Sequence, residues 1–234
     1  MNIFVSHPDP YESAKVLPDK HIVKMPLECC QMLSIIYSKW YYDWGPLPKK
    51  DGGYYATAKG AFRNHPCTIW AAQNHYNTAW LIQHGLALSA EYRARYDKVH
   101  SCAETLWEAK KIFHRQSGKA ITCYSMADNF ARAMPDEFKY DTSIDTFTAY
   151  KMYIASKPWV STNYKRIPDV NQNGSNMYED QDSYDKAVQL FGTRVSMICA
   201  MELAKKIDAE TAYSNIKIEL KALKAVRKEW KKDQ

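Results

Sequence analysis

Three ionisable residues near the start of the chain have a spacing that could support proton transfer. His21, Lys24 and Glu28 stand at positions i, i+3 and i+7, so an unbroken helix would place all three on one face. Apolar residues flank that face, and partial desolvation beside an amine or imidazole shifts the pKa of a carboxylate in a way that favours acid–base chemistry. The same triplet is also typical of a solvated helix face with an incidental Lys–Glu pair.

Two basic clusters lie at the ends of a long helix expected from residue 66 to residue 96. At its start, Arg63 and the backbone N–H groups of the first turn could bind a phosphate, or Asn64 or His65 could simply cap the helix. At its end stand Arg93 and Arg95, of which one is expected to neutralise the terminal carbonyls and the other to contact DNA. The alternative is that both arginines are ordinary surface charge.

A third cluster joins aromatic and basic side chains in a loop-like stretch. Trp159 is followed by Lys165 and Arg166, a combination that suits stacking on bases and contact with phosphates. The alternative is a Trp that anchors a loop onto the core. The C-terminal helix is also basic, but Glu219 and Glu229 dilute its charge, and it is a weaker indication of DNA contact.

The histidines and cysteines do not have the spacing of a metal site. No His pair stands at i and i+4, no Cys-x-x-Cys is present, and no glycine-rich phosphate loop occurs. We therefore expect neither a metal nor a cofactor. Most of the six cysteines lie in apolar helical runs, so we expect reduced, buried thiols and an intracellular, cytoplasmic protein.

Composition allows one sizeable core and a polyanionic partner. The chain has 234 residues, 46% of them hydrophobic, and 32 basic against 26 acidic residues, which gives a net charge of +6. No apolar stretch reaches the roughly 20 residues that a bilayer requires. The N-terminus also lacks the basic and apolar regions of a secretory signal, so no membrane association is expected.

Hydrophobic periodicity indicates a mainly α fold. We predict one compact helical domain over residues 1–166 and a helical extension over residues 183–234, joined by a polar linker at 167–182. Pro26 should kink or divide the helix that begins at Asp19. Further helices are predicted at 11–17, 66–96, 104–115, 145–156, 183–207 and 209–232, with a single helical turn at 128–132.

The run from Asp19 to Glu28 resembles the first helix of the pyrimidine dimer DNA glycosylases of the phage endonuclease V type. In that family a histidine is followed seven positions later by the catalytic glutamate, and His21 and Glu28 match these two residues. A long helix with several aromatic residues follows, as in the family. Residues 157–159 and 164–165 are similar to its tail rich in Pro, Trp, Tyr and Lys, so the likeness extends over about the first 165 residues.

The resemblance implies a DNA glycosylase with an associated AP-lyase activity, acting on ultraviolet-type damage in double-stranded DNA. The family uses the α-amine exposed when the initiator Met is removed, but Asn2 is large for that removal, so the amine expected here is that of Met1. Lys24 is the rival nucleophile. An α-amine has an ordinary pKa of about 7.7–8.0 against about 10.4 for a lysine, so the terminal amine needs less help to become neutral.

Two departures from the family pattern keep other functions open. The family's arginine beside the glutamate has no match among Met25, Pro26 and Leu27, and the chain is considerably longer. A transferase that decorates a DNA base would use similar base-access machinery and would add mass to the DNA. A non-catalytic DNA-binding accessory protein would bind in a salt-sensitive manner without turnover.

Overall fold

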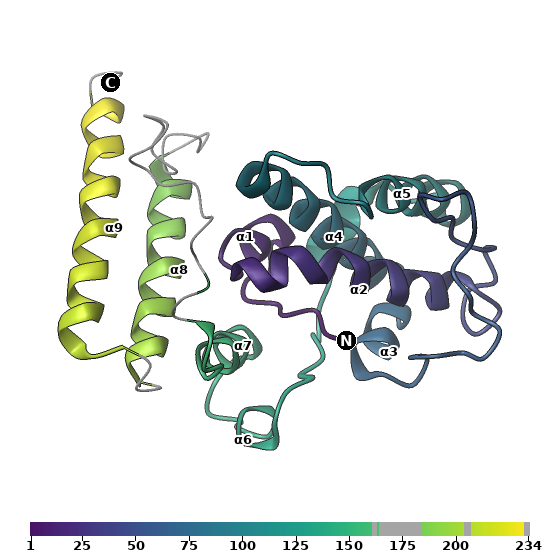
Figure 1. The fold of residues 1–234 in the computed structure, drawn as a ribbon, viewed down its shortest axis with the longest axis horizontal. Coiled ribbons are helices and arrows are strands. Elements are labelled where there is room, and N and C mark those ends of the chain that lie inside the picture. The colour runs from purple at the N-terminus through teal and green to yellow at the C-terminus, as the bar shows by residue number, and fades with distance from the viewer. Residues whose placement is uncertain (161–162, 164–183, 204–206, 232–234) are drawn as a thin grey trace. The chain divides into compact units, whose positions relative to one another are not determined.

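The computed structural model describes residues 1–160, 163, 184–203 and 207–231 and confirms a mainly helical protein (Figure 1). Within those residues no strand forms, and the one β-bridge joins Pro48 to Tyr54. None of the helices in the described part of the chain is long and apolar enough to cross a membrane. The chain divides into two compact units, residues 1–150 and residues 151–234, which are described separately below.

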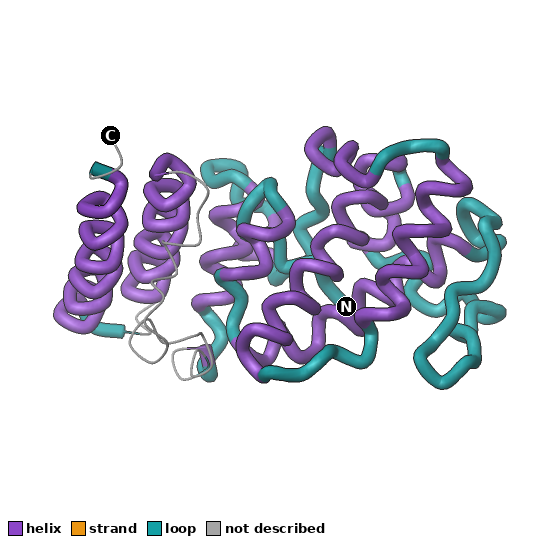
Figure 2. Tube along the Cα trace, turned by 90° about the horizontal axis from the view of Figure 1, so that it is seen from above, coloured by secondary structure: helices purple, strands orange, loops and turns teal. Residues whose placement is uncertain are grey.

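The first unit is built around its longest helix, α4. Helices α1, α2, α3 and α5 and the 3-10 turn η1 all pack against α4. The segment between α2 and α3, residues 38–65, is irregular (Figure 2). The elements are α1 (Pro10–Lys15), α2 (Asp19–Tyr37), α3 (Pro66–Ala72), α4 (His75–Tyr96), α5 (Ala103–Ser117), η1 (Ile121–Met126), α6 (Asp136–Lys139) and α7 (Thr146–Ala155), the last of which runs across the boundary at residue 150.

A glycine allows α4 to lie close to its neighbours. A Cβ added at Gly85 would stand 2.6 Å from a methyl carbon of Leu106 on α5 and 3.2 Å from the Cβ of Cys29 on α2. Both neighbours are fully buried. Because close-packed interiors cannot easily absorb an extra methyl group, the missing side chain fixes how near α2 comes to the centre of the unit.

Helix α2 runs through Pro26 without being divided. It begins after Pro18 and is buried along most of its length, and Ile22, Met25 and Leu33 are nearly or fully inaccessible. Proline removes one backbone donor from the helix interior. Burial of the apolar residues on both sides of Pro26 stabilises the helix by tertiary packing, which outweighs the lost hydrogen bond.

Two predicted helical segments are wrong in detail. The helix expected over residues 66–96 is two helices, because the side chain of Asn74 accepts a hydrogen bond from the backbone N–H of Asn77 at 2.9 Å and caps a new helix there. The helical turn expected at 128–132 is absent. Its place is taken by η1 a few residues earlier, and Asn129 has a φ of +50° that no right-handed helix accommodates.

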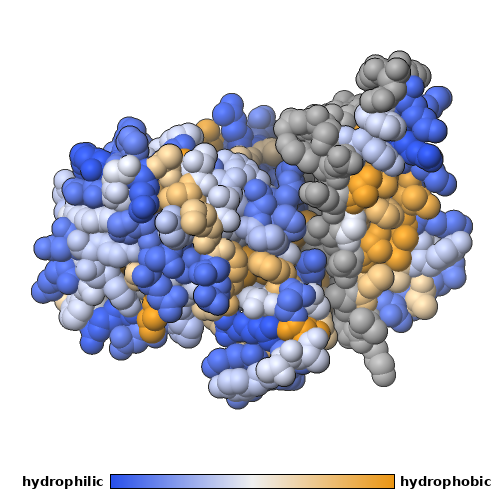
Figure 3. Space-filling model, turned by 180° about the vertical axis from the view of Figure 1, so that it is seen from behind, coloured by the Kyte–Doolittle hydropathy of each residue, from blue (hydrophilic) through white to orange (hydrophobic). Residues whose placement is uncertain are grey.

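The second unit contains the antiparallel pair α8 (Tyr184–Leu203) and α9 (Ala209–Trp230). Ala187 and Leu223 form its buried centre, and the rings of Tyr184 and Trp230 stack with centroids 5.1 Å apart. Figure 3 shows hydrophilic side chains and an apolar patch together on the visible face of this pair. The predicted linker at 167–182 lies outside the described residues.

Candidate active site at the start of the chain

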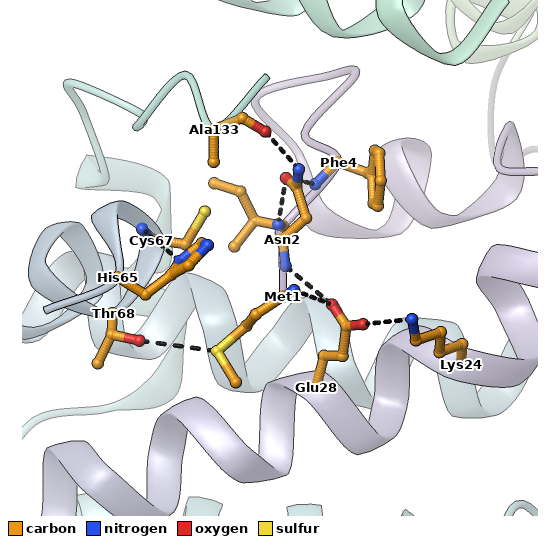
Figure 4. A network of polar contacts seen from close by, with 10 residues as sticks. Met1, Asn2, Phe4, Lys24, Glu28, His65, Cys67, Thr68 and Ala133 are labelled. Carbon is orange, nitrogen blue, oxygen red and sulfur yellow. Dashed lines mark hydrogen bonds and ion pairs between the residues drawn. The ribbon is translucent and has the colours of Figure 1, made fainter. Parts of the chain in front are cut away.

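The carboxylate of Glu28 lies against the first two nitrogens of the chain. Its side chain is 8% exposed, and its Oε2 accepts a hydrogen bond from the backbone N–H of Asn2 at 2.8 Å. The terminal nitrogen of Met1 lies 3.7 Å from the same oxygen (Figure 4). A buried carboxylate is costly unless it is paired and hydrogen-bonded, and here the start of the chain supplies both interactions.

Asn2 fixes the chain start in place through its side chain. Its Oδ1 accepts hydrogen bonds from the backbone N–H groups of Ile3 and Phe4 at 2.7 and 3.1 Å. Its Nδ2 donates to the backbone oxygen of Ala133 at 2.6 Å. Phe4 has a φ of +41°, so the chain turns directly after the residues that face Glu28. A chain terminus usually frays, and these bonds hold this one against α2.

The other two members of the predicted triplet have different surroundings. The ammonium nitrogen of Lys24 lies 3.2 Å from Oε1 of Glu28, and the lysine side chain is 70% exposed. His21 is buried, and its ring stacks on Phe4 with centroids 3.9 Å apart. The structure therefore brings Lys24 to the carboxylate and packs the imidazole of His21 against the residue that follows the chain start.

His65 lies close enough to the terminal amine for the amine's charge to affect the pKa of the imidazole, a relationship that its sequence context did not indicate. Its Nδ1 accepts a hydrogen bond from the backbone N–H of Cys67 at 3.2 Å and caps α3. Burial lowers the pKa of His65, the ammonium of Met1 lowers it further, and the charge of Glu28 opposes both effects. A neutral imidazole is therefore favoured next to the amine (Figure 4).

The structure shows His65, one of the two predicted capping residues, at the N-cap of α3. Phosphate binding at this turn stays a prediction. The guanidinium of Arg63 lies over the ring of Trp40 at 4.3 Å and donates to the backbone oxygen of Lys59 at 3.3 Å. Arg63 is half-buried. Contact between Arg63 and DNA stays a prediction.

Phe62 is a large, exposed aromatic residue in the loop before α3, and it is not among the residues singled out from the sequence. It is 49% exposed and has a φ of +67°, a conformation that usually costs a non-glycine residue about 1 kcal/mol or more. The loop that carries it is tightly held, because a Cβ at Gly60 would stand 2.7 Å from the ring of Trp40.

Arg95 is a correction to the predicted DNA contacts. Its side chain is fully buried and pairs with Asp19 at 3.1 Å and with Glu91 at 2.7 Å. It also donates to two backbone oxygens at the end of α1, so its hydrogen-bonding groups are engaged inside the protein. The residue two positions earlier, Arg93, projects from the opposite side of the helix and is exposed. Arg93 alone of this pair can meet a phosphate.

The remaining predicted DNA contacts belong to the second unit. Trp159 is half-buried, and the ammonium of Lys157 lies 4.0 Å from the ring centroid of Tyr153 in the same segment. Lys165 and Arg166 lie outside the described residues. The involvement of this cluster in DNA binding stays a prediction.

Two thiols near the carboxylate are held in their neutral form. Burial raises the pKa of Cys67 to about 12, and burial followed by the charge of Glu28 raises the pKa of Cys29. Neither thiol therefore carries a negative charge that would compete with Glu28 for the amine. In the described part of the chain, no three His, Cys, Asp or Glu side chains converge as metal ligands would.

Together, the helical fold and this site define an enzyme-like arrangement in which a buried carboxylate faces a chain-terminal amine. Residues 1–104 match the model of the pyrimidine dimer DNA glycosylase family, which confirms the resemblance over this part of the chain. The likeness expected at residues 157–165 lies outside the matched segment. Residues 177–234 match a family of unknown function (DUF7219). Neither the curated proteins nor the solved structures gave a match.

Proposed function

We propose that the protein is a DNA repair glycosylase, acting inside the cell, that excises pyrimidine-dimer-type damage from duplex DNA through an imine and then cleaves the abasic site. The observation that carries the proposal is the approach of Glu28 to the nitrogens of Met1 and Asn2, at 3.7 and 2.8 Å. The family match over residues 1–104 supports damaged DNA as the substrate.

The chemistry follows from an amine beside a carboxylate. The neutral amine attacks C1′ of the damaged nucleotide, and the base leaves with the electrons of the glycosidic bond and takes a proton. The sugar then opens to an imine, and removal of a C2′ proton expels the 3′ phosphate. Glu28 stabilises the positive charge that develops at C1′ and accepts the C2′ proton.

The terminal ammonium is proposed to lose its proton to solvent. A protonated amine has no lone pair, so one proton must leave before the attack on C1′. His65 cannot take that proton while it caps α3, because the one lone pair of its neutral ring, on Nδ1, already accepts from the backbone N–H of Cys67. Its place at the N-cap of α3 holds the ring in a fixed orientation.

An α-amine is better supported as the nucleophile than Lys24. The Lys24 side chain is 70% exposed and serves as a counter-ion on Oε1 of Glu28, whereas the terminal nitrogen lies on the buried side of the carboxylate. The amine is that of Met1 in the intact chain. If Met1 were removed, the nitrogen of Asn2, which already bonds to Glu28, would become the terminal amine.

Phe62 is the proposed wedge that enters the DNA. Glycosylases must draw a nucleotide out of the stack, and an inserted apolar side chain can fill the space that remains. Phe62 is half-exposed and lies three residues before His65, on a loop that packs closely against the ring of Trp40 at Gly60. Arg63 and Arg93 are the proposed phosphate contacts of this unit.

Borohydride trapping tests the proposal directly. The protein is incubated with ultraviolet-irradiated, abasic and undamaged duplexes, the imine is reduced, and mass spectrometry locates the adduct on Met1, Asn2 or Lys24. We expect an α-amine adduct with damaged and abasic DNA and none with undamaged DNA. Absence of an adduct on all three amines would overturn the imine mechanism.

The variant Glu28→Gln tests the carboxylate. Loss of a charge that stabilises a transition state typically lowers the rate by about 10²–10³-fold. The matched control is Glu108→Gln, which removes an exposed carboxylate paired with Lys111 on α5 and should leave the rate unchanged. DNA that gains mass would instead indicate a transferase, and salt-sensitive binding without turnover would indicate an accessory protein.

A further inference from the structure

Helix α9 carries a line of lysines along one face. Successive members of this line are three or four residues apart, and they are Lys217, Lys221, Lys224, Lys228 and Lys231. All five are exposed. At about 100° per residue these positions fall within an arc of about 80°, and they extend over roughly 21 Å of helix axis. We call these five residues the lysine row.

The lysine row faces away from α8. The residues of α9 that are buried against that helix, including Ala212, Glu219 and Leu223, occupy other positions around its axis. Glu219 pairs with Arg194 of α8, so its charge is used within the helical pair. Glu210 stands in the first turn of α9, before the lysine row begins.

An exposed aromatic ring continues the row toward the start of the helix. Tyr213 stands four residues before Lys217, is 54% exposed, and has the Lys217 ammonium 4.6 Å from its ring centroid. A helix that needed these lysines only for solubility would not require them on a single face. Five cations at intervals on the order of 5 Å form a linear array that fits a linear polyanion.

We infer that the lysine row binds the phosphate backbone of double-stranded DNA and gives the protein affinity for DNA regardless of sequence or damage. Duplex DNA carries about one negative charge per 1.7 Å of axis, and lysine ammonium groups bind phosphates as point charges without reading bases. The choice of DNA as the polyanion rests on the proposed function of the N-terminal unit. The inference assigns a role to the segment that matches a family of unknown function.

Salt-dependent binding to an undamaged duplex tests the inference. The affinity of the full chain for a duplex of about 30 base pairs is measured by fluorescence anisotropy between about 50 and 200 mM KCl. The tested variant replaces Lys217, Lys221, Lys224 and Lys228 by Gln. The slope of log K against log salt should become shallower by about 3 to 4, and affinity at the upper salt concentrations should fall by at least about tenfold.

Two further variants separate position from total charge. Replacing Lys98, Lys110, Lys111 and Lys139 by Gln removes the same charge from the first unit, and the slope should remain close to that of the unaltered protein. Replacing the four row lysines by Arg keeps the charge and should also preserve the slope. An unchanged slope in the Gln variant of the row, or an equal change in the first-unit variant, would overturn the inference.

The binding test is independent of catalysis. It uses undamaged DNA and requires no turnover, and circular dichroism should show equal helix content in all variants because every replaced lysine is at least partly exposed. A protein that shows row-dependent binding but no borohydride adduct would refute the imine chemistry and keep the DNA-binding row. A protein that forms the adduct but binds independently of the row would refute this inference alone.

Discussion

The backbone N–H of Asn2 donates to Oε2 of Glu28 over 2.8 Å, and both residues are only 6% exposed. This bond joins the second residue of the chain to a helix that lies some 26 positions further along. It holds the terminal nitrogen within the reach of one carboxylate. The proposed chemistry depends on this arrangement, because an amine in free solution would spend little time in position to attack a sugar carbon.

Adding one glycine before Met1 should abolish the trapped adduct on the chain start. The added residue turns the nitrogen of Met1 into an amide, which cannot form an imine, and the Met1 side chain is 2% exposed, so little space remains for a new terminus. Borohydride trapping with abasic DNA measures the effect. The control adds the same glycine after Gln234. A full yield of adduct on Lys24 in the extended protein would contradict the α-amine assignment.

Phe62→Ala should slow excision from irradiated duplex DNA by about tenfold. One stacking contact between an aromatic ring and a base is worth roughly 1–3 kcal/mol, and that contribution is lost with the ring. Single-turnover rates on irradiated duplex DNA measure the change. Tyr140→Ala is the matched control, since Tyr140 is 65% exposed and has no proposed contact with DNA. An equal loss in both variants would remove the wedge role from Phe62.

Arg95→Met should lower the free energy of unfolding by about 3–5 kcal/mol. The substitution removes the guanidinium charge that pairs with the buried carboxylate of Asp19 and the partly buried carboxylate of Glu91, and removing one member of a buried ion pair is strongly destabilising. Urea unfolding measures the change. Arg93→Gln on the same helix should change stability by less than about 0.5 kcal/mol. Similar effects of the two substitutions would contradict the structural role of Arg95.

Stability should fall as the pH drops from about 6.5 to about 4. Burial lowers the pKa of His84 to about 4, from an ordinary value near 6.5, and the ring is bonded to the oxygen of Pro10 and stacked on Trp80. Because the unfolded chain binds the proton more readily in this interval, the contribution is complete above about pH 6.5 and is lost toward pH 4. Its size is roughly 3 kcal/mol.

Urea unfolding at several pH values measures this dependence. His84→Gln should flatten the decline between pH 6.5 and pH 4, since the titrating group is gone. His114→Gln, which removes an exposed imidazole from α5, should leave the decline unchanged. A decline of equal steepness in the His84 variant would show that other groups dominate.

The contact between Lys24 and Glu28 was predictable because it is local. Two residues one turn apart on a helix must lie close together, and the helical pattern from Asp19 onward is strong. The same pattern allowed α2, α5 and the C-terminal helices to be anticipated. The break between α3 and α4 could not be predicted, because the apolar pattern continues across it. It depends on the side chain of Asn74 acting as an N-cap, which the hydrophobic pattern does not reveal.

The rest of the site depends on contacts between distant parts of the chain. The proximity of His65 to the amine follows from how α3 packs against α2, which no local spacing encodes. Arg93 and Arg95 have similar neighbours in the sequence, and the second is buried because Asp19 and the backbone at the end of α1 lie against its side of α4. A buried arginine and an exposed one are therefore indistinguishable until the packing of α1 and α2 against α4 is known.

The acceptor for the Asn2 side chain sets a lower limit on the smallest working fragment. The backbone oxygen of Ala133 accepts that hydrogen bond, and Ala133 lies beyond the segment matched to the glycosylase family. Ala133 is itself held by Tyr150, whose hydroxyl accepts a hydrogen bond from the backbone N–H of Ala133 at 3.2 Å. A truncated protein ending near residue 104 would keep Glu28 but lose the hydrogen bond from Asn2 to Ala133 that helps to position the first residues. Gene truncation or domain grafting should therefore retain at least residues 1–150.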